Sequence, residues 1–177
     1  MNNNSQELDI QGYTILKNAA PMELISSLQS YAQEFLKCEK NSSSIIEAMS
    51  QLEILDKKKF YSFCIEMGKI LPATQIAGIS SILSLVKEVL KTENIYLTDT
   101  AIFFNKIDVT RLQYDWHTEK SYFPNANEVI TLWYPWLHNV NVDNGTMIMA
   151  DASHKKTHTA ETIHVKDGLT QMKIKET

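Results

Sequence analysis

The sequence predicts an α+β fold in which a helical N-terminal region precedes a β-rich C-terminal region. Apolar residues recur at spacings of three and four across residues 20–92, which is the period of amphipathic helices. From residue 94 onward, aromatic and β-branched residues gather in short runs that are typical of strands. Asp143-Asn144-Gly145 lies between two such runs and predicts a tight turn. Helices followed by several strands favour a β-sandwich or barrel at the C-terminal end.

The N-terminal region is expected to begin with a short strand at residues 12–16, followed by four helices. Asn18 can cap the first helix, and Pro21 falls in its first turn, where a missing N–H has no cost. The run Ser42-Ser43-Ser44, with Glu47 close behind, resembles a capping box and opens the second helix. The expected helices cover about residues 19–35, 42–55, 57–70 and 79–90. Their apolar stripes indicate a layer that packs against a sheet.

The C-terminal region is expected to form the sheet. Between residues 112 and 117 apolar and polar side chains alternate, so a strand there would present two distinct faces. No linker or repeat divides the chain, which predicts a single domain over 1–177, with 1–92 as the helical layer and 93–177 as the β core. The further strands are expected over about residues 95–104, 129–142 and 146–149.

Composition and charge exclude several functional classes. The 177 residues carry 17 basic and 21 acidic side chains, and this net charge of −4 argues against binding through nucleic-acid phosphates. Neither an apolar stretch of about 18 residues nor an export signal occurs, so we expect a cytoplasmic protein that binds no membrane. The expected partner is a small-molecule substrate, and the oligomeric state stays open. Cys38 and Cys64 are expected to be reduced, buried thiols.

The segment Tyr114–Lys120 carries the clearest chemical signal. On a strand, residues i and i+2 point to the same side, so His117 and Glu119 would project together. An imidazole nitrogen and a carboxylate oxygen so placed supply two thirds of a 2-His-1-carboxylate triad, which leaves positions on Fe(II) open. Asp115 lies on the same face, as a rival ligand or as an acceptor for the imidazole N–H.

Several spaced motifs, taken together, resemble the phytanoyl-CoA dioxygenase family. This resemblance covers about residues 10–155 and implies an Fe(II)- and 2-oxoglutarate-dependent dioxygenase on a double-stranded β-helix, a cupin-like jelly roll. It also implies hydroxylation of a small-molecule or an acyl- or carrier-bound substrate. The motifs are Phe104-Asn105-Lys106, His117-Thr118-Glu119, Tyr122-Phe123-Pro124, Trp133, Asn144-Gly145 and Ser153-His154-Lys155.

The resemblance also assigns roles to individual residues. It implies iron ligation by His117 and Glu119, and catalytic residues beyond the metal ligands are not expected. Trp133 matches a residue that lies against 2-oxoglutarate, and Ile102 matches an apolar position that lines the same pocket. Tyr114 and Thr131 are assigned to this cavity by strand alternation. His154 matches a loop residue outside the metal site.

The sequence departs from the family pattern in three ways. Glu119 stands where Asp is usual, so a bound metal would sit slightly differently. Ala150-Asp151-Ala152 replaces the usual Pro-Gly before the Ser-His-Lys loop. The distal His and the Arg that pairs with the far carboxylate of 2-oxoglutarate are also missing, because no Arg follows Arg111 before the last residue, Thr177. Arg is the side chain best shaped to pair with a buried carboxylate, so this third departure affects the co-substrate site directly.

Three hypotheses account for the missing groups. The chain lacks the closing strands, or other residues replace the groups, or catalysis has been lost. The replacements would be a Lys and one of His138, His158 and His164, of which His164 is the best candidate ligand because it lies in a strand-like run. Two further functions stay open, namely a non-catalytic small-ligand-binding module of the same fold and a different metal-dependent β-barrel enzyme. A third ligand with a cation, and dependence on 2-oxoglutarate, would distinguish them from an oxygenase.

Overall fold

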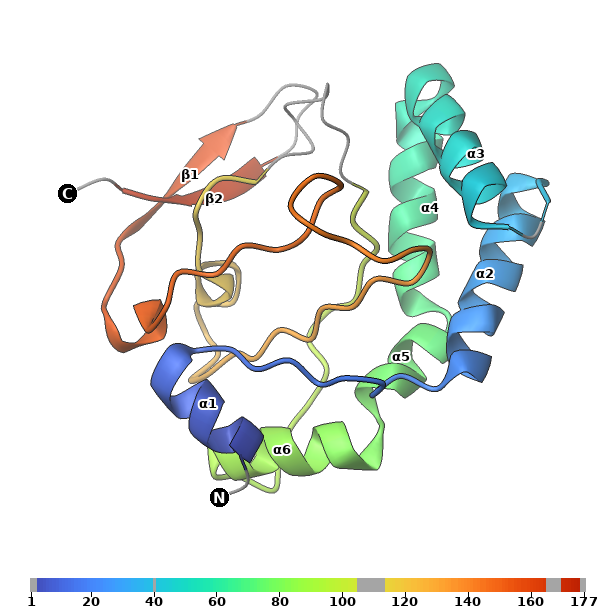
Figure 1. Cartoon of the computed structure of the whole chain (residues 1–177). Helices are drawn as coiled ribbons and strands as arrows, with labels where there is room; N and C mark the ends of the chain where they lie inside the picture. Colours follow the sequence, from blue (N-terminus) through green and yellow to red (C-terminus); the bar gives the residue numbers. More distant parts are fainter. Residues whose placement is uncertain (1–2, 40, 105–113, 165–169, 176–177) are drawn as a thin grey trace. The chain divides into compact units, whose positions relative to one another are not determined.

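The computed structural model describes residues 3–39, 41–104, 114–164 and 170–175. Contacts within the chain group it into two compact units, and each is described by itself. The helical unit comprises Leu16–Phe103 and Tyr134–Asn141. The hairpin unit comprises Met1–Ile15, Phe104–Trp133 and Val142–Thr177. The helices and the small sheet are shown in Figure 1.

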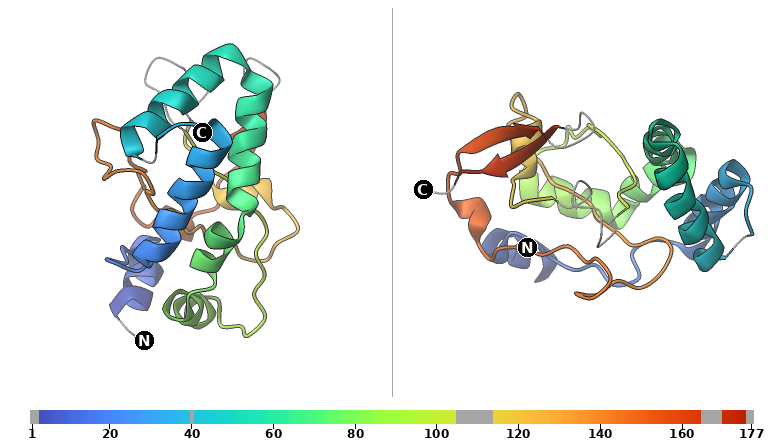
Figure 2. Two further views of the ribbon diagram at one scale, coloured as in Figure 1. Left: turned by 90° about the vertical axis from the view of Figure 1, so that its right-hand side faces the viewer. Right: turned by 90° about the horizontal axis from the view of Figure 1, so that it is seen from above.

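The described residues of the helical unit form five helices, of which α2, α3 and α4 pack against one another (Figures 1 and 2). The Asn41 side chain caps α3 by accepting from the Ser44 N–H at 2.8 Å, so the expected capping box is replaced by an Asn cap one residue earlier. Asp56 caps α4 in the same way through the Lys59 N–H at 3.0 Å. The helices are α2 (Met22–Leu36), α3 (Ser42–Leu55), α4 (Lys57–Lys69), α5 (Leu71–Ala77) and α6 (Ser80–Leu90).

The apolar stripes of these helices pack against one another in the core of the helical unit, whereas the sequence predicts a layer that packs against a sheet. The Phe35 and Phe63 rings lie 5.0 Å apart between α2 and α4. Cys64, the residue after Phe63, is buried. Burial raises the pKa of its thiol to about 12, so the thiol stays protonated. Both cysteines are free, although Cys38 is only half-buried. The largest fully buried side chains are Phe60, Phe63, Leu28, Ile45, Met49 and Ile76.

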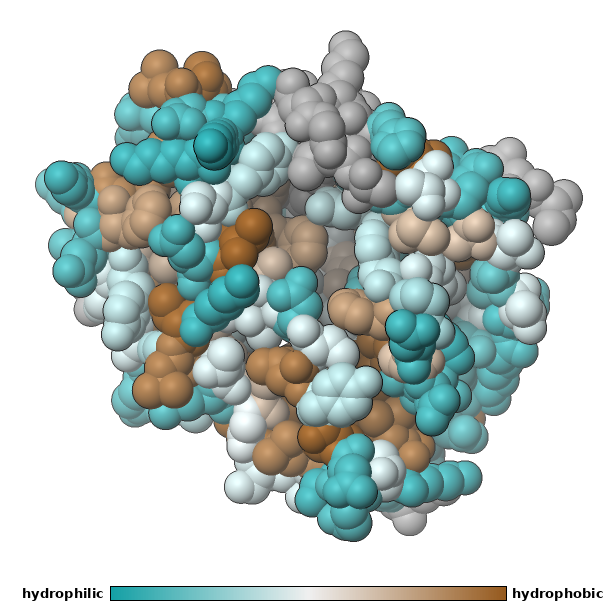
Figure 3. All heavy atoms as spheres, turned by 180° about the vertical axis from the view of Figure 1, so that it is seen from behind, coloured by the Kyte–Doolittle hydropathy of each residue, from teal (hydrophilic) through white to brown (hydrophobic). Residues whose placement is uncertain are grey.

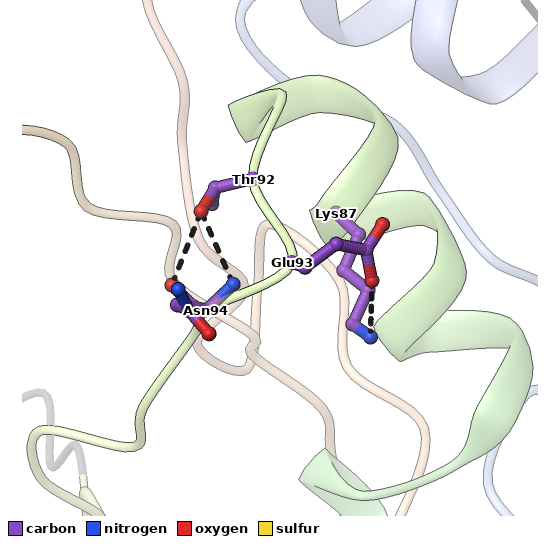
Figure 4. Close-up of polar contacts among 4 residues, drawn as sticks. All are labelled: Lys87, Thr92, Glu93 and Asn94. Carbon is purple, nitrogen blue, oxygen red and sulfur yellow. Dashed lines mark hydrogen bonds and ion pairs between the residues drawn. The ribbon is translucent and has the colours of Figure 1, made fainter.

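The helical region ends near residue 92, where the sequence predicts the change of character. Lys91 adopts the left-handed conformation that commonly terminates a helix, and its N–H bonds the Lys87 carbonyl. Thr92 Oγ1 then accepts from the Asn94 N–H at 3.1 Å, and Lys87 pairs with Glu93 at 2.9 Å (Figure 4). These local bonds stop α6 and direct the chain into an extended segment.

The extended segment at residues 95–103 lies along α4 instead of pairing in a sheet. The Ile102 N–H donates to the Cys64 carbonyl at 3.2 Å, and the Thr100 hydroxyl donates to the Gly68 carbonyl. A side chain on Gly68 would not fit, because an added Cβ would lie 2.7 Å from the Ala101 Cα and closer still to the Thr100 carbonyl. Gly68 therefore permits the close approach that fixes Ile102.

The hairpin unit contains the only paired strands among the described residues. Its elements are α1 (Asn3–Gln11), the 3-10 turns η2 (Glu119–Tyr122) and η3 (Ser153–Lys155), and the strands β1 (Ala160–His164) and β2 (Thr170–Ile174). The strands are antiparallel, with Ala160 opposite Ile174 and His164 opposite Thr170. A turn forms at residues 142–145 as predicted, with Gly145 at φ 104°.

The described residues therefore show an α+β chain but not the double-stranded β-helix that the sequence predicts. The segments expected as strands at 12–16, 95–104, 129–142 and 146–149 have no strand pairing where they are described. Side-chain alternation reports a preference for extended backbone, whereas a strand also needs a hydrogen-bonded neighbour. Several apolar side chains of these segments are exposed, among them Tyr96, Val142 and Ile148. Figure 3 shows apolar patches on one face of the surface.

The N-terminal helix α1 is anchored to the loop that carries η3. The Ala152 N–H donates to the Gln11 carbonyl at 2.8 Å, and His154 Nε2 donates to the Asp9 carbonyl at 3.1 Å. Gly12 lies at the bend that follows α1 and has a φ of 89°. An added Cβ there would lie 2.5 Å from His154 Nδ1. The sequence gives no signal for α1 because its polar residues form no apolar stripe.

No single helix in the described ranges has the length and apolar composition needed to cross a membrane, although α5 and α6 together meet that criterion as a pair bent by 50°.

Substitution of Gly68 by Ala is expected to destabilise the helical unit by about 1–3 kcal/mol, the usual cost of overpacking. The added methyl must displace the Thr100–Ala101 backbone. Chemical denaturation followed by helical circular dichroism measures the change. Gly78→Ala is the matched control, because Gly78 has φ −83° and its added Cβ would lie 3.4 Å from the nearest atom. Equal stability of the two variants would contradict the close approach at Gly68.

Substitution of Gly12 by Ala is expected to release α1 from the η3 loop. The positive φ costs an L-residue about 1–2 kcal/mol, and the methyl also collides with the His154 ring. Hydrogen exchange should become faster at the Ala152 amide, which bonds Gln11. The double substitution G12A/H154A removes the collision but keeps the backbone strain, and its comparison with H154A, which also loses the bond to Asp9, isolates the effect of the strain at residue 12. Unchanged exchange in G12A would show that this anchor is unimportant.

Candidate metal centre

His117 and Glu119 face each other, as the sequence predicts. Their Nε2 and Oε1 atoms lie 3.4 Å apart, and the two side chains are 23% and 42% exposed. The intervening Thr118 has extended backbone at φ −111° and ψ 137°, and Glu119 then opens the η2 turn. A single extended residue is sufficient to place its two neighbours on the same side of the chain. The predicted juxtaposition is therefore achieved without a paired strand.

A backbone carbonyl fixes the protonation of the His117 ring. His117 Nδ1 lies 2.6 Å from the Asp115 carbonyl oxygen, which can only accept a hydrogen bond. Nδ1 therefore carries a proton, and in the neutral ring the lone pair is on Nε2, the nitrogen that faces Glu119. Ligating histidines characteristically use the second ring nitrogen in this way. The pair thus presents one nitrogen and one oxygen donor to the same point.

Asp115 contributes its backbone, not its carboxylate, to this arrangement. Its Oδ2 atom pairs with the Nζ atom of Lys173, a residue of β2, at 3.3 Å. Of the two roles that the sequence leaves open for Asp115, the structure supports acceptance of the imidazole proton, although through the carbonyl oxygen. The carboxylate is directed to a lysine instead of to a shared ligand position.

Two tyrosine rings lie beside the imidazole. The Tyr114 ring centroid is 5.9 Å from that of His117, and the Tyr122 centroid is 5.6 Å away in an edge-to-face arrangement at 87°. Trp116, by contrast, is 57% exposed, so only part of the aromatic cluster in this segment shelters the pair. The ring faces exclude some of the water that would otherwise solvate His117.

Glu119 raises the pKa of His117 above its usual value. The hydrogen bond to the Glu119 carboxylate is the largest cause, burial of the ring acts in the opposite direction, and the Asp115 carbonyl adds to the increase. A proton and a metal ion would compete for the same Nε2 lone pair. Ligation at this site would therefore strengthen as the pH rises through the His117 pKa.

No third ligand joins the pair within the described ranges, where groups of three or more His, Cys, Asp or Glu placed to hold a metal are absent. His154 and His158 bond the Asp9 and Ser153 carbonyls instead. His138 is exposed and belongs to the helical unit. His164 lies at the exposed end of β1, opposite Thr170.

The residues predicted to bind 2-oxoglutarate do not form one site within either unit. The Tyr114 ring contacts the His117 ring at a tilt of 54°, and Tyr114 is 44% exposed. Thr131 and Trp133 are exposed and lie in a segment without helix or strand. Ile102 belongs to the helical unit, where its N–H is bonded to Cys64. The motif residues Asn105 and Lys106, and the single arginine, Arg111, lie outside the described residues.

An open hollow of about 400 Å³ lies beside the β1–β2 hairpin and is lined by Glu161, Lys173, Ile174 and Lys175. Its charged side chains carry both signs, and none of the predicted cofactor residues lines it. Lys173 and the neighbouring β2 residues contact the segment that bears the His117–Glu119 pair, and sequence reasoning missed them. They lie more than 50 residues from His117, and no local pattern connects the two segments.

The fold and the site define a candidate non-haem metal protein with a mixed imidazole and carboxylate donor pair. The family model for phytanoyl-CoA dioxygenase matches residues 8–176. The chain therefore belongs to the phytanoyl-CoA dioxygenase family, whose fold is cupin-like and whose members are oxygenases of the Fe(II)- and 2-oxoglutarate-dependent type. Neither the comparison with curated proteins nor the comparison with solved structures returned a match.

We expect the His117 imidazole to titrate above the ordinary histidine value of about 6.5. Glu119→Gln should lower this pKa, because it removes the carboxylate that favours the charged ring. The pair stabilises the fold fully below pH ~6.5, and its contribution is lost as the pH rises through the higher folded pKa. NMR titration of the imidazole protons measures both effects. Glu161→Gln, on the exposed β1 strand, is the control, and an equal effect of the two variants would contradict the assignment.

Proposed function

We propose that this protein is an Fe(II)/2-oxoglutarate-dependent dioxygenase that hydroxylates a small-molecule or an acyl- or carrier-bound substrate. Membership of the phytanoyl-CoA dioxygenase family supports the reaction class. The observation that carries the assignment to particular residues is the His117–Glu119 pair, 3.4 Å apart, with Nδ1 bonded to a carbonyl and Nε2 directed at the carboxylate. Neither a nucleic acid nor a membrane belongs to the proposed set of partners.

The donor atoms of this pair fit a ferrous ion. One imidazole nitrogen and one carboxylate oxygen are two of the three ligands in the 2-His-1-carboxylate sites of non-haem iron oxygenases. When bound, iron with 2-oxoglutarate supplies the activation of O₂ that the side chains cannot perform. His117 and Glu119 would hold the ion and would not transfer protons. Tyr114 and Tyr122 would exclude water from the imidazole side of the site.

The third ligand is proposed to be His164. It lies on β1 opposite Thr170, whereas the bond from the Ile174 N–H to the Trp116 carbonyl, at 2.8 Å, is at the other end of the hairpin, where Ile174 pairs with Ala160. This hairpin therefore connects His164 to the ligand segment within the same compact unit. The imidazole of His164 is exposed, so ligation would require a change at the end of the strand.

The fold proposed for the working enzyme is the double-stranded β-helix of the family, as a single domain over 1–177 with its helical layer at 1–92. The cupin-like character of the family supports it. In such a domain Trp133, Ile102, Thr131 and Tyr114 would contact 2-oxoglutarate. The segments at 95–103, 129–135 and 146–150, which have no helix or strand assignment, supply the polypeptide from which further strands would form.

A non-catalytic small-ligand-binding module is the second candidate function. It is favoured by one observation, that the described residues bring together two donors and not three. A different metal-dependent β-barrel enzyme would use the same pair without 2-oxoglutarate. Anaerobic titration with Fe(II) and 2-oxoglutarate separates these functions, because only the oxygenase forms the visible charge-transfer band of the chelated co-substrate.

His117→Ala and Glu119→Ala are each expected to reduce Fe(II)-dependent succinate formation at least 100-fold, since each removes a metal ligand. Both side chains are partly exposed, so the fold should persist, as circular dichroism can verify. His138→Ala and Glu161→Ala remove the same side-chain types at exposed positions and should leave turnover unchanged. Undiminished succinate formation in either ligand variant would discard the assignment of that ligand.

A further inference from the structure

Strand β2 contacts the ligand-bearing segment on both sides of the His117–Glu119 pair. Before the pair, the Ile174 N–H donates to the Trp116 carbonyl at 2.8 Å, and Lys173 pairs with Asp115 at 3.3 Å. After the pair, the Met172 N–H donates to the Tyr122 hydroxyl at 2.9 Å. Three consecutive residues of one strand therefore contact the segment at 115–122. All of these residues belong to the hairpin unit.

Tyr122 is the residue that touches both β2 and the imidazole. Its hydroxyl accepts from the Met172 backbone, and its ring packs edge-to-face with the His117 ring at 5.6 Å and 87°. It also ends the η2 turn that Glu119 begins. Half-burial of the phenol raises the pKa of Tyr122, so the hydroxyl remains protonated at neutral pH.

Four contacts limit the orientation of the His117 ring, and one of them is the Tyr114 ring at 5.9 Å. Nδ1 is bonded to the Asp115 carbonyl, Nε2 faces Glu119, and the ring contacts Tyr122. A hydrogen bond to Nδ1 alone leaves the imidazole free to tilt about that bond. The Tyr122 ring blocks this tilt from the side, because aromatic pairs in contact resist rotation through each other's volume. The Tyr122 ring therefore limits the tilt that the hydrogen bond to Nδ1 leaves open.

We propose that Tyr122 is a positioning residue for metal binding, which holds the His117 imidazole in its ligating orientation by bracing it against β2. This proposal rests on the proposed function, because it concerns the same metal pair. Outer-shell partners of metal-ligating histidines commonly contribute about 10–100-fold to metal affinity. Tyr122 would have this role although it donates nothing to the metal.

A purely structural role for Tyr122 makes a different prediction. If the residue only anchors β2, loss of its hydroxyl and loss of its ring should have equal effects, since both break the bond to Met172. If it positions His117, the ring matters more than the hydroxyl. Tyr122→Phe keeps the ring and loses the acceptor, whereas Tyr122→Leu loses both. The two variants therefore separate bracing of the strand from bracing of the imidazole.

The test is a titration of the full chain with Co(II), followed by visible absorption and calorimetry. Tyr122→Leu is expected to bind Co(II) about 10–100-fold more weakly than the native chain, and Tyr122→Phe less than about tenfold more weakly. In the metal-free chain, the His117 ring-proton resonances should shift in Tyr122→Leu, because a ring current is lost. The Met172 amide should exchange faster in both variants. Tyr96→Leu, at a residue 76% exposed in the helical unit, is the control.

Native-like Co(II) affinity and unchanged His117 resonances in Tyr122→Leu would overturn the proposal. If that variant does not fold, Tyr122→Phe decides, and Co(II) binding weakened by more than about tenfold in Tyr122→Phe is then the contradicting result, because the hydroxyl and not the ring would carry the effect. If the native chain binds Co(II) no better than His117→Ala, the proposed function fails. In that case the His117 resonances still test the contact, and a shift in Tyr122→Leu alone supports positioning.

Discussion

The hydrogen bond between His117 Nδ1 and the Asp115 carbonyl, 2.6 Å long, is the interaction on which the candidate site depends. It assigns the ring proton to one nitrogen and leaves the other with the lone pair that a metal requires. The same stretch of chain then continues through extended Thr118, which places Glu119 on the Nε2 side. One local backbone conformation therefore creates the acceptor, the free nitrogen and the second donor. Without this bond the tautomer would be unassigned and the pair would have no defined direction.

Glu119 can bond the protonated imidazole or share a metal ion with it, but it cannot do both at once. In the metal-free chain its carboxylate bonds the imidazole and raises the pKa of His117, so the proton occupies the position that a cation would take. A divalent ion bound by both residues would take the place of that proton, and His117 and Glu119 would then hold a larger charge between them. The extra methylene of Glu relative to the Asp usual in this family matters here, because the carboxylate must reach back from the first residue of η2. The departure from the family pattern is therefore compatible with a paired donor set.

Local features of this protein follow from its sequence, and non-local ones do not. Helices α2, α3, α4 and α6, the turn at residues 142–145 and the convergence of His117 with Glu119 each depend on a pattern within a few residues, so the sequence predicts them. The short helix α5 is not predicted. The strand pairing cannot be predicted from the sequence in this way, because alternation indicates an extended backbone but does not determine which segment it pairs with. The contacts of Lys173 with Asp115 and of Met172 with Tyr122 join segments 58 and 50 residues apart, and no local pattern reports them.

The two units are stabilised by different forces, and this difference determines how the site responds to substitution. Every buried apolar side chain among the described residues belongs to the helical unit, whereas the buried side chains of the hairpin unit are Ser5 and Gln171. The described part of the hairpin unit has no buried apolar side chain and relies on hydrogen bonds, of about 0.5–1.5 kcal/mol each, together with ring contacts and exposed ion pairs that contribute less. A metal ion that binds only the folded arrangement adds its binding free energy to this small total. A bound metal would therefore help to order the ligand pair. A site built on an apolar core would not need this help.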